Sequence, residues 1–257
     1  MTGTDNLHTR RNAAPSIDEL RIAITGGTSG LGLALVRACA RRRAHVAFVA
    51  RDRERVERIS AETGAHGIVG DIARKDNSHR IALQIIGLLG GVDVLINNAS
   101  SLGPIPLRPL ADTECEDLED ALATNLVGPF RLTKALLGSL AASARERRGA
   151  VVLNVSSDAA INPYAGWGAY GASKAALHHL SRIWDEELGS QGVRFLSIDP
   201  GDMDTPLHAL AVPDADPATL RRPADSAAAL LAAIERALAE THCSGEMRTV
   251  EEIAACR

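Results

Sequence analysis

The chain has 257 residues, of which 46% are hydrophobic, 23% charged and only 3% aromatic, and its formal net charge is −4. This length suits one α/β domain, or at most two small ones. The negative charge argues against a broad nucleic-acid surface, and no apolar run reaches the ~18 residues of a membrane span. The four cysteines and eight histidines are scattered without CxxC or HExxH spacing, so neither a disulfide framework nor a metal site is indicated. Unpaired thiols suit a reducing cytoplasm, where we expect the protein to act.

The order of the segments predicts a single α/β domain. Residues 1–18 lack the apolar central region of a signal peptide, and we expect them to form a flexible tail before a domain of residues 19–257. Short apolar segments alternate with amphipathic ones, which is typical of a parallel sheet covered by helices on both faces. We therefore predict a Rossmann-type doubly wound parallel sheet of about seven strands.

The individual elements follow from the same alternation. The predicted strands are 21–24, 45–50, 66–71, 92–96, 149–155 and 193–198, with one last short strand near the C-terminus. The predicted helices are 31–43, 52–63, 74–89, 112–140 with a kink at Pro129, 168–188 and 224–239. The predicted core face of helix 168–188 consists of Leu177, Leu180, Ile183, Trp184 and Leu188.

A glycine-rich stretch, TGGTSGLG at residues 25–32, lies between the first strand and the first helix. A strand, a glycine-rich turn and a helix form the unit that binds a dinucleotide. Glycine lets the backbone approach a pyrophosphate, and the helix N-terminus presents free N–H groups. The spacing is TGxxxGxG rather than GxGxxG. A glycine loop alone is also compatible with ordinary turn chemistry, but its position between a strand and a helix favours dinucleotide binding.

Arg51 follows the end of the second strand, where an NAD site usually carries a carboxylate that binds the ribose 2′-hydroxyl. An arginine matches a 2′-phosphate instead, so Arg51 favours NADP(H) over NAD(H). The alternative is that Arg51 pairs with acidic neighbours in the charged helix that follows. We also expect Asp71 and Ile72, at the end of the third strand, to meet the adenine.

Tyr170 and Lys174 are four residues apart in the helix predicted at 168–188, and Ser157 lies thirteen residues before the tyrosine. Positions i and i+4 share one helix face, so the ammonium group of Lys174 can lie beside the ring of Tyr170. A nearby cation favours the phenolate, and lowering the phenol pKa from ~10 to ~7 would need roughly 4 kcal/mol. Ser157 would hold a substrate oxygen against the tyrosine. A YxxxK spacing alone is most often an ordinary solvated helix face, so its meaning depends on the other motifs.

Taken together, these motifs resemble those of the short-chain dehydrogenase/reductase family, in its short single-domain branch. The resemblance covers the chain from Leu20 to about residue 250 and rests on the order and spacing of several motifs. These motifs are residues 25–32, Asp71, Asn97-Asn98-Ala99, Asn125, Ser157, Tyr170 with Lys174, and Pro200-Gly201.

The resemblance implies a role for each matching residue. Tyr170 would be the general acid in carbonyl reduction and the base in alcohol oxidation, and Lys174 would lower its pKa and hold the nicotinamide ribose. Ser157 would orient the carbonyl oxygen, and Asn125 would support a water-linked proton path through Lys174. With the residues above, the expected cofactor site comprises Gly26, Thr28, Ser29, Gly30, Leu31, Gly32, Arg51, Asp71, Ile72, Asn98, Ala99, Tyr170, Lys174, Pro200, Gly201, Met203 and Thr205.

The resemblance also implies an oxidoreductase of a small carbonyl or alcohol, for which Arg51 favours NADP(H), acting as a homotetramer or homodimer through the helices near 112–140 and 168–188. Residues 206–223 would form a lid over the substrate. Two other functions stay open: a cofactor-binding protein without turnover, and a related lyase or epimerase. The chain departs from the family pattern at Ser100, where a glycine is usual, and at the acidic residues Asp202 and Asp204.

Overall fold

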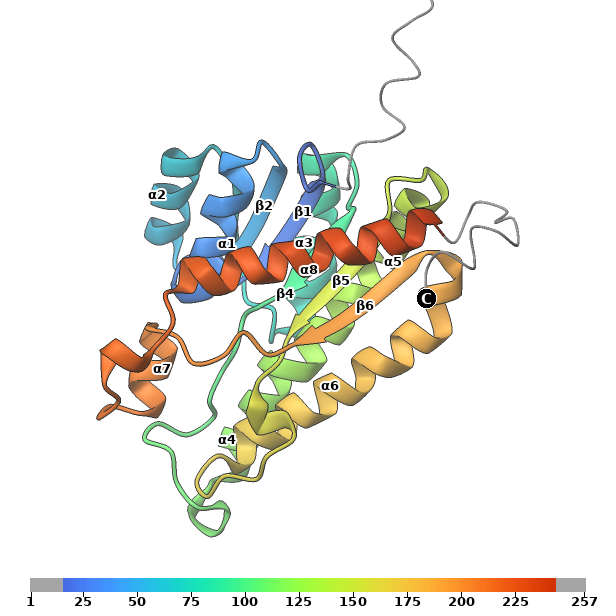
Figure 1. Cartoon of the computed structure of the whole chain (residues 1–257). Coiled ribbons are helices and arrows are strands. Elements are labelled where there is room, and N and C mark those ends of the chain that lie inside the picture. Colours follow the sequence, from blue (N-terminus) through green and yellow to red (C-terminus); the bar gives the residue numbers. More distant parts are fainter. Residues whose placement is uncertain (1–15, 244–257) are drawn as a thin grey trace, which may run out of the picture.

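The computed structural model describes residues 16–243, and its centre is a parallel sheet of six strands in the order β3-β2-β1-β4-β5-β6 (Figure 1). The predicted Rossmann-type sheet is therefore confirmed, while the predicted last strand near the C-terminus lies outside the described residues. The order reverses between β1 and β4, so the chain builds the sheet outward in both directions from this pair. The strands are β1 (Arg21–Thr25), β2 (His45–Ala50), β3 (His66–Val69), β4 (Val94–Asn97), β5 (Ala150–Val155) and β6 (Val193–Ile198).

Helices cover both faces of the sheet because each strand is apolar on both sides. Along β1, Ile22 and Ile24 point into one core and Ala23 points into the other. The first core lies under α1 (Gly30–Arg41), α2 (Arg53–Thr63) and α8 (Pro223–Cys243). The second core lies under α3 (Lys75–Leu89), α5 (Gly128–Arg145) and α6 (Gly168–Leu188). Shorter helical segments are Leu110–Asp112, α4 (Cys115–Leu122), Ala123–Val127, Asp158–Ala160, Gly189–Gln191, α7 (Pro206–Ala211) and Pro217–Thr219.

The predicted helix 112–140 is divided in the structure, just before its proline. A π-helical turn at Ala123–Val127 separates α4 from α5. Pro129 lies in the first turn of α5, directly after the π-helical turn, and the backbone of Leu122, Val127 and Gly128 around that turn is helical. The interruption lies one turn before Pro129, at the turn that contains Asn125, and the kink at Pro129 stays a prediction.

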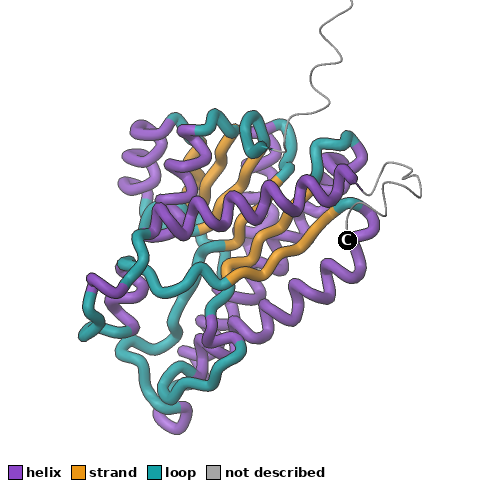
Figure 2. Tube along the Cα trace, viewed as in Figure 1, coloured by secondary structure: helices purple, strands orange, loops and turns teal. Residues whose placement is uncertain are grey.

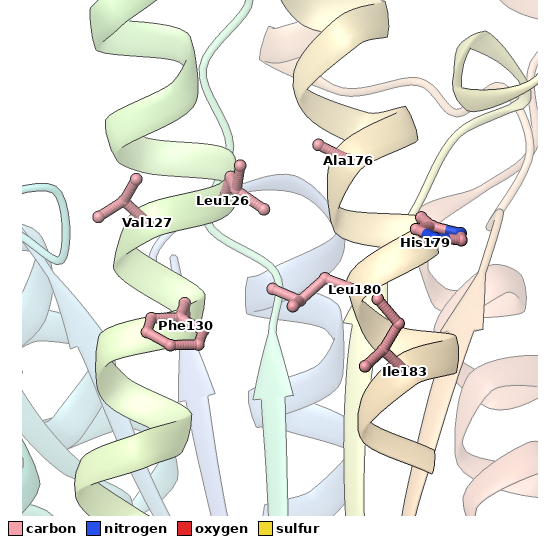
Figure 3. Close-up of a pocket in the computed structure, with 7 residues that line it drawn as sticks. All are labelled: Leu126, Val127, Phe130, Ala176, His179, Leu180 and Ile183. Atoms are coloured by element: carbon pink, nitrogen blue, oxygen red, sulfur yellow. The ribbon is translucent and has the colours of Figure 1, made fainter. Parts of the chain in front are cut away.

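The predicted core face of α6 is only partly correct. Leu177 is buried, but Ile183 is 42% exposed. Leu180 and Ile183 instead line a surface pocket together with Phe130 of α5 (Figure 3). The polar residues Ser173, Lys174 and Ser181 are buried on α6 in their place. Apolar spacing alone therefore misjudged which side of this helix faces the protein interior.

The described chain begins in contact with the core. Ile17 is fully buried, and its N–H group donates to Glu235 Oε1 of α8 at 3.1 Å. The tail predicted for residues 1–18 thus includes a residue that packs against the domain. Within residues 16–243, no helix combines the length and the apolar character needed to cross a membrane.

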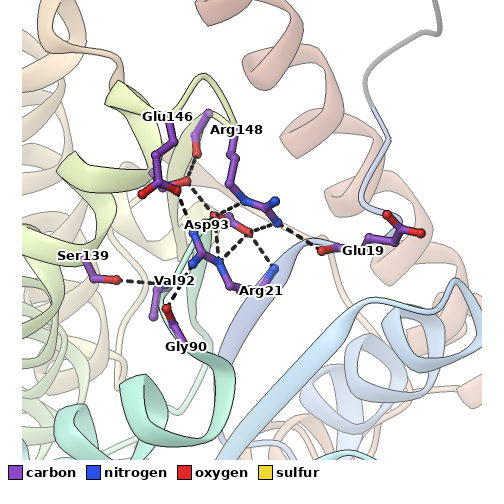
Figure 4. A network of polar contacts seen from close by, with 10 residues as sticks. Glu19, Arg21, Gly90, Val92, Asp93, Ser139, Glu146 and Arg148 are labelled. Atoms are coloured by element: carbon purple, nitrogen blue, oxygen red, sulfur yellow. Dashed lines mark hydrogen bonds and ion pairs between the residues drawn. The ribbon is translucent and has the colours of Figure 1, made fainter. Parts of the chain in front are cut away.

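A buried carboxylate joins three strands at the amino end of the sheet (Figure 4). Asp93 precedes β4, and its side chain is completely buried. It accepts hydrogen bonds from Arg21 Nη2 at 2.6 Å, Arg148 Nη2 at 3.0 Å and Ser143 Oγ at 2.6 Å. Burial alone would raise the pKa of Asp93, but these hydrogen bonds outweigh it and lower the pKa to about 2. The network ties the starts of β1 and β5 to β4.

We predict that Asp93→Asn lowers the free energy of unfolding at neutral pH by about 3 kcal/mol, because two arginines lose their buried counter-charge. The folded pKa of Asp93 lies below its unfolded value of ~3.9, so its contribution is present above pH ~4 and lost as the pH falls towards ~2. The parent protein should therefore lose stability across this window more steeply than the variant. Urea unfolding at a series of acidic pH values measures both effects.

The control is Glu62→Gln, which removes an exposed ion pair with Arg37. This change should leave the unfolding midpoint nearly unchanged, because water already solvates both partners. Equal destabilisation by Asp93→Asn and Glu62→Gln would contradict a structural role for the buried network.

Candidate active site

The loops after β4, β5 and β6 gather at the carboxyl end of the sheet, beside the start of α6 (Figure 2). Ligands of doubly wound sheets bind at this end, near the point where the strand order reverses. Ser157 follows β5, and Tyr170 and Lys174 lie in the first two turns of α6. The structure brings these three residues together, although the chain separates the serine from the helix by a loop.

Tyr170 has a buried side chain, with only 8% of the residue exposed. Burial raises the pKa of Tyr170 to about 12. The hydroxyl groups of Ser157 and Ser100 have the opposite, smaller effect and lower this pKa. The carboxylates of Asp199 and Asp158 add to the increase. This direction is opposite to the sequence expectation of a pKa near ~7. In the protein without cofactor, Tyr170 is therefore a phenol at neutral pH.

Lys174 shares the predicted helix face with Tyr170. Its Nζ atom lies 5.5 Å from the centroid of the tyrosine ring and donates to the carbonyl oxygen of Val155 at 2.8 Å. Burial lowers the pKa of Lys174 to about 8. The same desolvation that disfavours the phenolate therefore disfavours the ammonium group, which is why their proximity alone does not produce an acidic tyrosine.

Ser157 is held by its neighbours in the turn after β5. Its hydroxyl group donates to Asp158 Oδ1 at 3.1 Å, and the other oxygen of Asp158 accepts from Tyr164 at 2.7 Å. The adjacent Ser156 is buried, and its N–H group donates to Ile198 in the sheet. Of these two serines, Ser157 is the one whose hydroxyl group lowers the pKa of the Tyr170 phenol.

Asn125 lies fully buried in the π-helical turn between α4 and α5. Its Oδ1 atom accepts from the Ser101 N–H group at 2.8 Å and from Ser100 Oγ at 3.2 Å. Its Nδ2 atom donates to the Ser101 carbonyl and to Ser173 Oγ, both at 2.8 Å. The amide thus joins the loop after β4 to α6. The structure gives it no direct contact with Lys174, so the water-linked path to that residue stays a prediction.

The glycine-rich stretch packs closely against the end of β4. Gly26 has a positive φ of 72°, and a Cβ atom on Gly32 would collide with the carbonyl oxygen of Gly26 and lie 2.5 Å from Asn98 Nδ2. Thr25 Oγ1 accepts from the N–H groups of Asn98 and Ala99, each at 3.0 Å. Asn98 therefore supports the glycine loop and the sheet.

The start of α1 has the features of an anion site. Ser29 is the N-cap residue but makes no side-chain capping hydrogen bond, and the first turn contains no acidic residue. Leu31 is buried, so only its backbone can face a ligand. Together with Thr28 and Gly30, these residues leave the helix N-terminus available to a phosphate group.

The loop after β6 lies against the glycine loop. A Cβ atom on Gly30 would approach Thr205 Cγ2 to 3.1 Å. Gly201 has a positive φ of 75°, the Pro200 carbonyl accepts from Ser226 Oγ at 2.8 Å, and Met203 pairs with Arg221. These contacts anchor both ends of the predicted lid, residues 206–223, which contains α7.

The residues expected to bind the adenosine half lie on the other side of β1. Arg51 is exposed at the end of β2, and its side chain makes no ion pair within residues 16–243. Its acidic neighbour Asp52 instead caps α2 by accepting from the Arg55 N–H group at 3.1 Å. The alternative that Arg51 pairs with acidic neighbours is therefore not observed. Asp71 and the buried Ile72 follow β3, and Asp71 Oδ1 accepts from the N–H group of Ala73.

Three residues beside Tyr170 were not identified from the sequence as part of the site: Ser100, Asp158 and Asp199. Each directly neighbours a recognised motif at the carboxyl end of a strand. That adjacency was the available signal, but it does not reveal which side chains turn towards the phenol.

Comparisons with known proteins identify the family of the chain. The family model described as short chain dehydrogenase matches residues 21–216. The chain is 35% identical over 187 residues to a serine 3-dehydrogenase of Agrobacterium fabrum, covering 72% of each protein. It is 32% identical over 187 residues to dehydrogenase/reductase SDR family member 4 of Oryctolagus cuniculus, covering 71% of this chain and 70% of that protein.

Solved structures show the same similarity. One is a 3-ketoacyl-(acyl-carrier-protein) reductase from Brucella melitensis complexed with NADH, with a TM-score of 0.78 and 27% identity over 84% of this chain and 90% of the other. Another is a short chain dehydrogenase from Shigella flexneri complexed with NADP, with a TM-score of 0.74 and 28% identity over 83% of this chain and 90% of the other. With its Tyr170 and Lys174 pair at the carboxyl end of a doubly wound sheet, the chain belongs to the short-chain dehydrogenase family of oxidoreductases.

Proposed function

We propose that the protein is an NADP(H)-dependent oxidoreductase that interconverts a small carbonyl compound and a secondary alcohol, with Tyr170 as general acid and base. The observation that carries this proposal is the buried Tyr170 phenol, which has Ser157 and Lys174 beside it at the ligand-binding end of the sheet. A nicotinamide, when bound, supplies or accepts the hydride.

The residues of the chain handle the proton. The high pKa of Tyr170, about 12, keeps the phenol protonated at neutral pH, which is the state needed to donate to a carbonyl oxygen. Ser157 turns its hydroxyl group from Asp158 to the same oxygen and stabilises the charge that develops there. Lys174 brings positive charge to the site, which offsets the phenolate that remains after proton transfer.

The glycine loop and the N-terminus of α1 have the features of a site that binds a dinucleotide. The glycine loop holds its backbone close to β4, and the N-terminus of α1 lacks a competing side-chain cap. Among solved relatives, one is complexed with NADP, one with NADPH and another with NADH, so the fold accepts both kinds of cofactor. The unpaired guanidinium group of Arg51, at the end of β2, favours the phosphorylated one.

We predict that Tyr170→Phe lowers kcat for carbonyl reduction by at least about 10²-fold, because the variant lacks the group that donates the proton. NADPH affinity should change little, since the phenol oxygen is not needed to hold the pyrophosphate. The measurement is steady-state reduction of a panel of small ketones and aldehydes, together with a fluorescence titration of NADPH. A parent protein that binds NADPH but turns over none of the panel would favour the binding protein without turnover.

We predict that the parent binds NADPH more tightly than NADH and that Arg51→Asp weakens NADPH binding by about 10- to 100-fold, since a charge-assisted hydrogen bond is lost. NADH binding should stay the same or improve. The matched control is Arg58→Asp, the same charge change on the exposed face of α2. Equal affinities of the parent for NADPH and NADH would overturn the NADP assignment and leave the reaction class intact.

An apolar face lies on the outer side of α5 and α6. It forms a hollow of about 430 Å³ lined by Leu126, Val127, Phe130, Ala176, His179, Leu180 and Ile183. Figure 3 shows these side chains on two neighbouring helical segments. Phe130 is 37% exposed and Ile183 is 42% exposed, and among residues 16–243 no Asp, Glu, Lys or Arg lines the hollow. We propose that a second copy of the chain covers this face, because a two-fold contact pairs one apolar surface with itself.

We predict that the parent protein has at least the mass of a dimer in solution and that Ile183→Lys shifts it towards the monomer, because the new charge would be buried in the contact. Sedimentation velocity at several concentrations measures this shift. Leu83→Lys is the control, since Leu83 is a 71% exposed leucine on α3, away from the hollow. A monomeric parent would contradict the proposal.

A further inference from the structure

Asp158 directly follows Ser157 in the turn after β5, and both of its carboxylate oxygens accept hydrogen bonds. Its Oδ1 atom accepts from Ser157 Oγ at 3.1 Å, and its Oδ2 atom accepts from the Tyr164 hydroxyl group at 2.7 Å. The Asp158 carbonyl also accepts from the N–H groups of Ile161 and Asn162, each at 2.9 Å. The backbone and one carboxylate oxygen are therefore held in place beside the serine of the proposed site.

Ser157 can give its hydrogen atom to only one strong acceptor at a time, because a serine hydroxyl group has one hydrogen and two lone pairs. The Ala159 N–H group donates to Ser157 Oγ at 3.2 Å, which holds the oxygen and leaves the hydrogen free to turn. The proposed function places this hydrogen on the substrate oxygen. Asp158 Oδ1 then loses the hydrogen bond from Ser157. Because Asp158 is exposed, a group of the substrate can reach that oxygen.

Apolar side chains surround the other side of Tyr170. The cluster that packs with this tyrosine consists of Leu102, Leu107, Ala159, Trp167, Leu207 and Ala211. The centroid of the Trp167 ring lies 5.6 Å from that of Tyr170 and 6.5 Å from that of Tyr164. Tyr164, which holds Asp158, is thus linked to the proposed acid and base through one aromatic ring. These surroundings suit a substrate with a short carbon skeleton and a polar group directed at Asp158.

The charges near the site favour a positively charged donor. Asp158 and Asp199 both raise the pKa of Tyr170 and so act against its phenolate. Lys174 is the nearby cation, but burial lowers its pKa to about 8. An ammonium group of the substrate at Asp158 would offset the carboxylate while the phenolate forms, and its hydrogen bond would be charge-assisted.

We propose that Asp158 is a specificity-determining residue, which binds a hydrogen-bond donor on the carbon next to the reacting carbon of the substrate. This inference deepens the proposed function and rests on it. In such a molecule the donor and the reacting oxygen are about one hydrogen-bond length apart, as Asp158 Oδ1 and Ser157 Oγ are at 3.1 Å. The substrate class is therefore a vicinal amino alcohol or diol, or the corresponding amino or hydroxy carbonyl compound. Asp158 itself gains and loses no proton.

The test uses isopropanolamine, propylene glycol and propylene glycol methyl ether, which carry an ammonium, a hydroxyl and a methoxy group beside the same secondary alcohol. An alcohol cannot react with a reduced cofactor, so an NMR titration of the NADPH-bound protein measures binding without turnover. We expect isopropanolamine to bind about tenfold more tightly than the methyl ether, because it gains a hydrogen bond to a charged group. Propylene glycol should bind with an affinity between the two. With NADP⁺, kcat/KM for oxidation should follow the same order.

Two variants assign this preference to Asp158. Asp158→Ala should reduce the affinity ratio between isopropanolamine and the methyl ether to about one, because the acceptor is removed. Tyr164→Phe keeps the ring beside Trp167 and removes only the hydroxyl group that holds Asp158 Oδ2, so the ratio should fall about threefold. The matched control is Asp120→Ala, which removes an exposed carboxylate of α4 and should keep the ratio of the parent.

The outcomes separate this inference from the proposed function. Equal affinities of the parent for isopropanolamine and the methyl ether would overturn the inference, and so would a preference that persists in Asp158→Ala. A preference that depends on Asp158, in a protein that oxidises none of the compounds, would support the inference and count against the proposed function. Oxidation of all the compounds with equal kcat/KM would support the proposed function and overturn the inference.

Discussion

Polar contacts join β1 and β4 at both ends of the strand pair. The positions of the glycine loop after β1 and of the loop after β4 depend on these contacts. At the amino end, Asp93 accepts a hydrogen bond from Arg21 at 2.6 Å in a buried network. At the carboxyl end, Thr25 Oγ1 accepts from the N–H group of Asn98, whose side chain donates back to the Thr25 carbonyl at 2.9 Å. Because the strand order reverses here, the chain leaves β1 and β4 in opposite directions and opens the crevice in which a dinucleotide binds. The polar contacts at the two ends of the strands hold β1 and β4 in register. The apolar strands themselves form the floor of the crevice.

Burial dominates the electrostatics of the candidate site. It raises the pKa of Tyr170 and lowers that of Lys174, so in the protein without cofactor both groups are pushed towards their neutral forms. Hydroxyl groups act against this effect on the tyrosine, since Ser157 and Ser100 can donate to a phenolate without carrying a charge that must be desolvated. A site of this kind depends on the placement of a few neutral donors as much as on the nearby cation.

Helix α6 connects the site with the surface of the molecule. Its inner side carries Tyr170, Ser173 and Lys174, and its outer side contributes Leu180 and Ile183 to the apolar hollow. The hydrogen bond from Asn125 to Ser173 fixes this helix to the π-helical turn, and the residues after Asn125 line the same hollow. A second copy bound at this face would therefore contact α6 and the π-helical turn, the two segments that carry Tyr170, Lys174 and Asn125.

The features that depend on local order can be predicted from the sequence. The alternation of strands and helices, the glycine loop between β1 and α1, the Arg51 position after β2 and the shared face of Tyr170 and Lys174 all follow from neighbours a few residues apart. The tertiary structure alone decided what depends on distant neighbours. It turned the Ser100 hydroxyl towards Asn125, filled all four hydrogen-bonding positions of that amide, left Ile183 exposed and reversed the expected pKa shift of Tyr170. Burial and hydrogen-bond partners come from segments far apart in the chain, and no local pattern records how completely those segments exclude water.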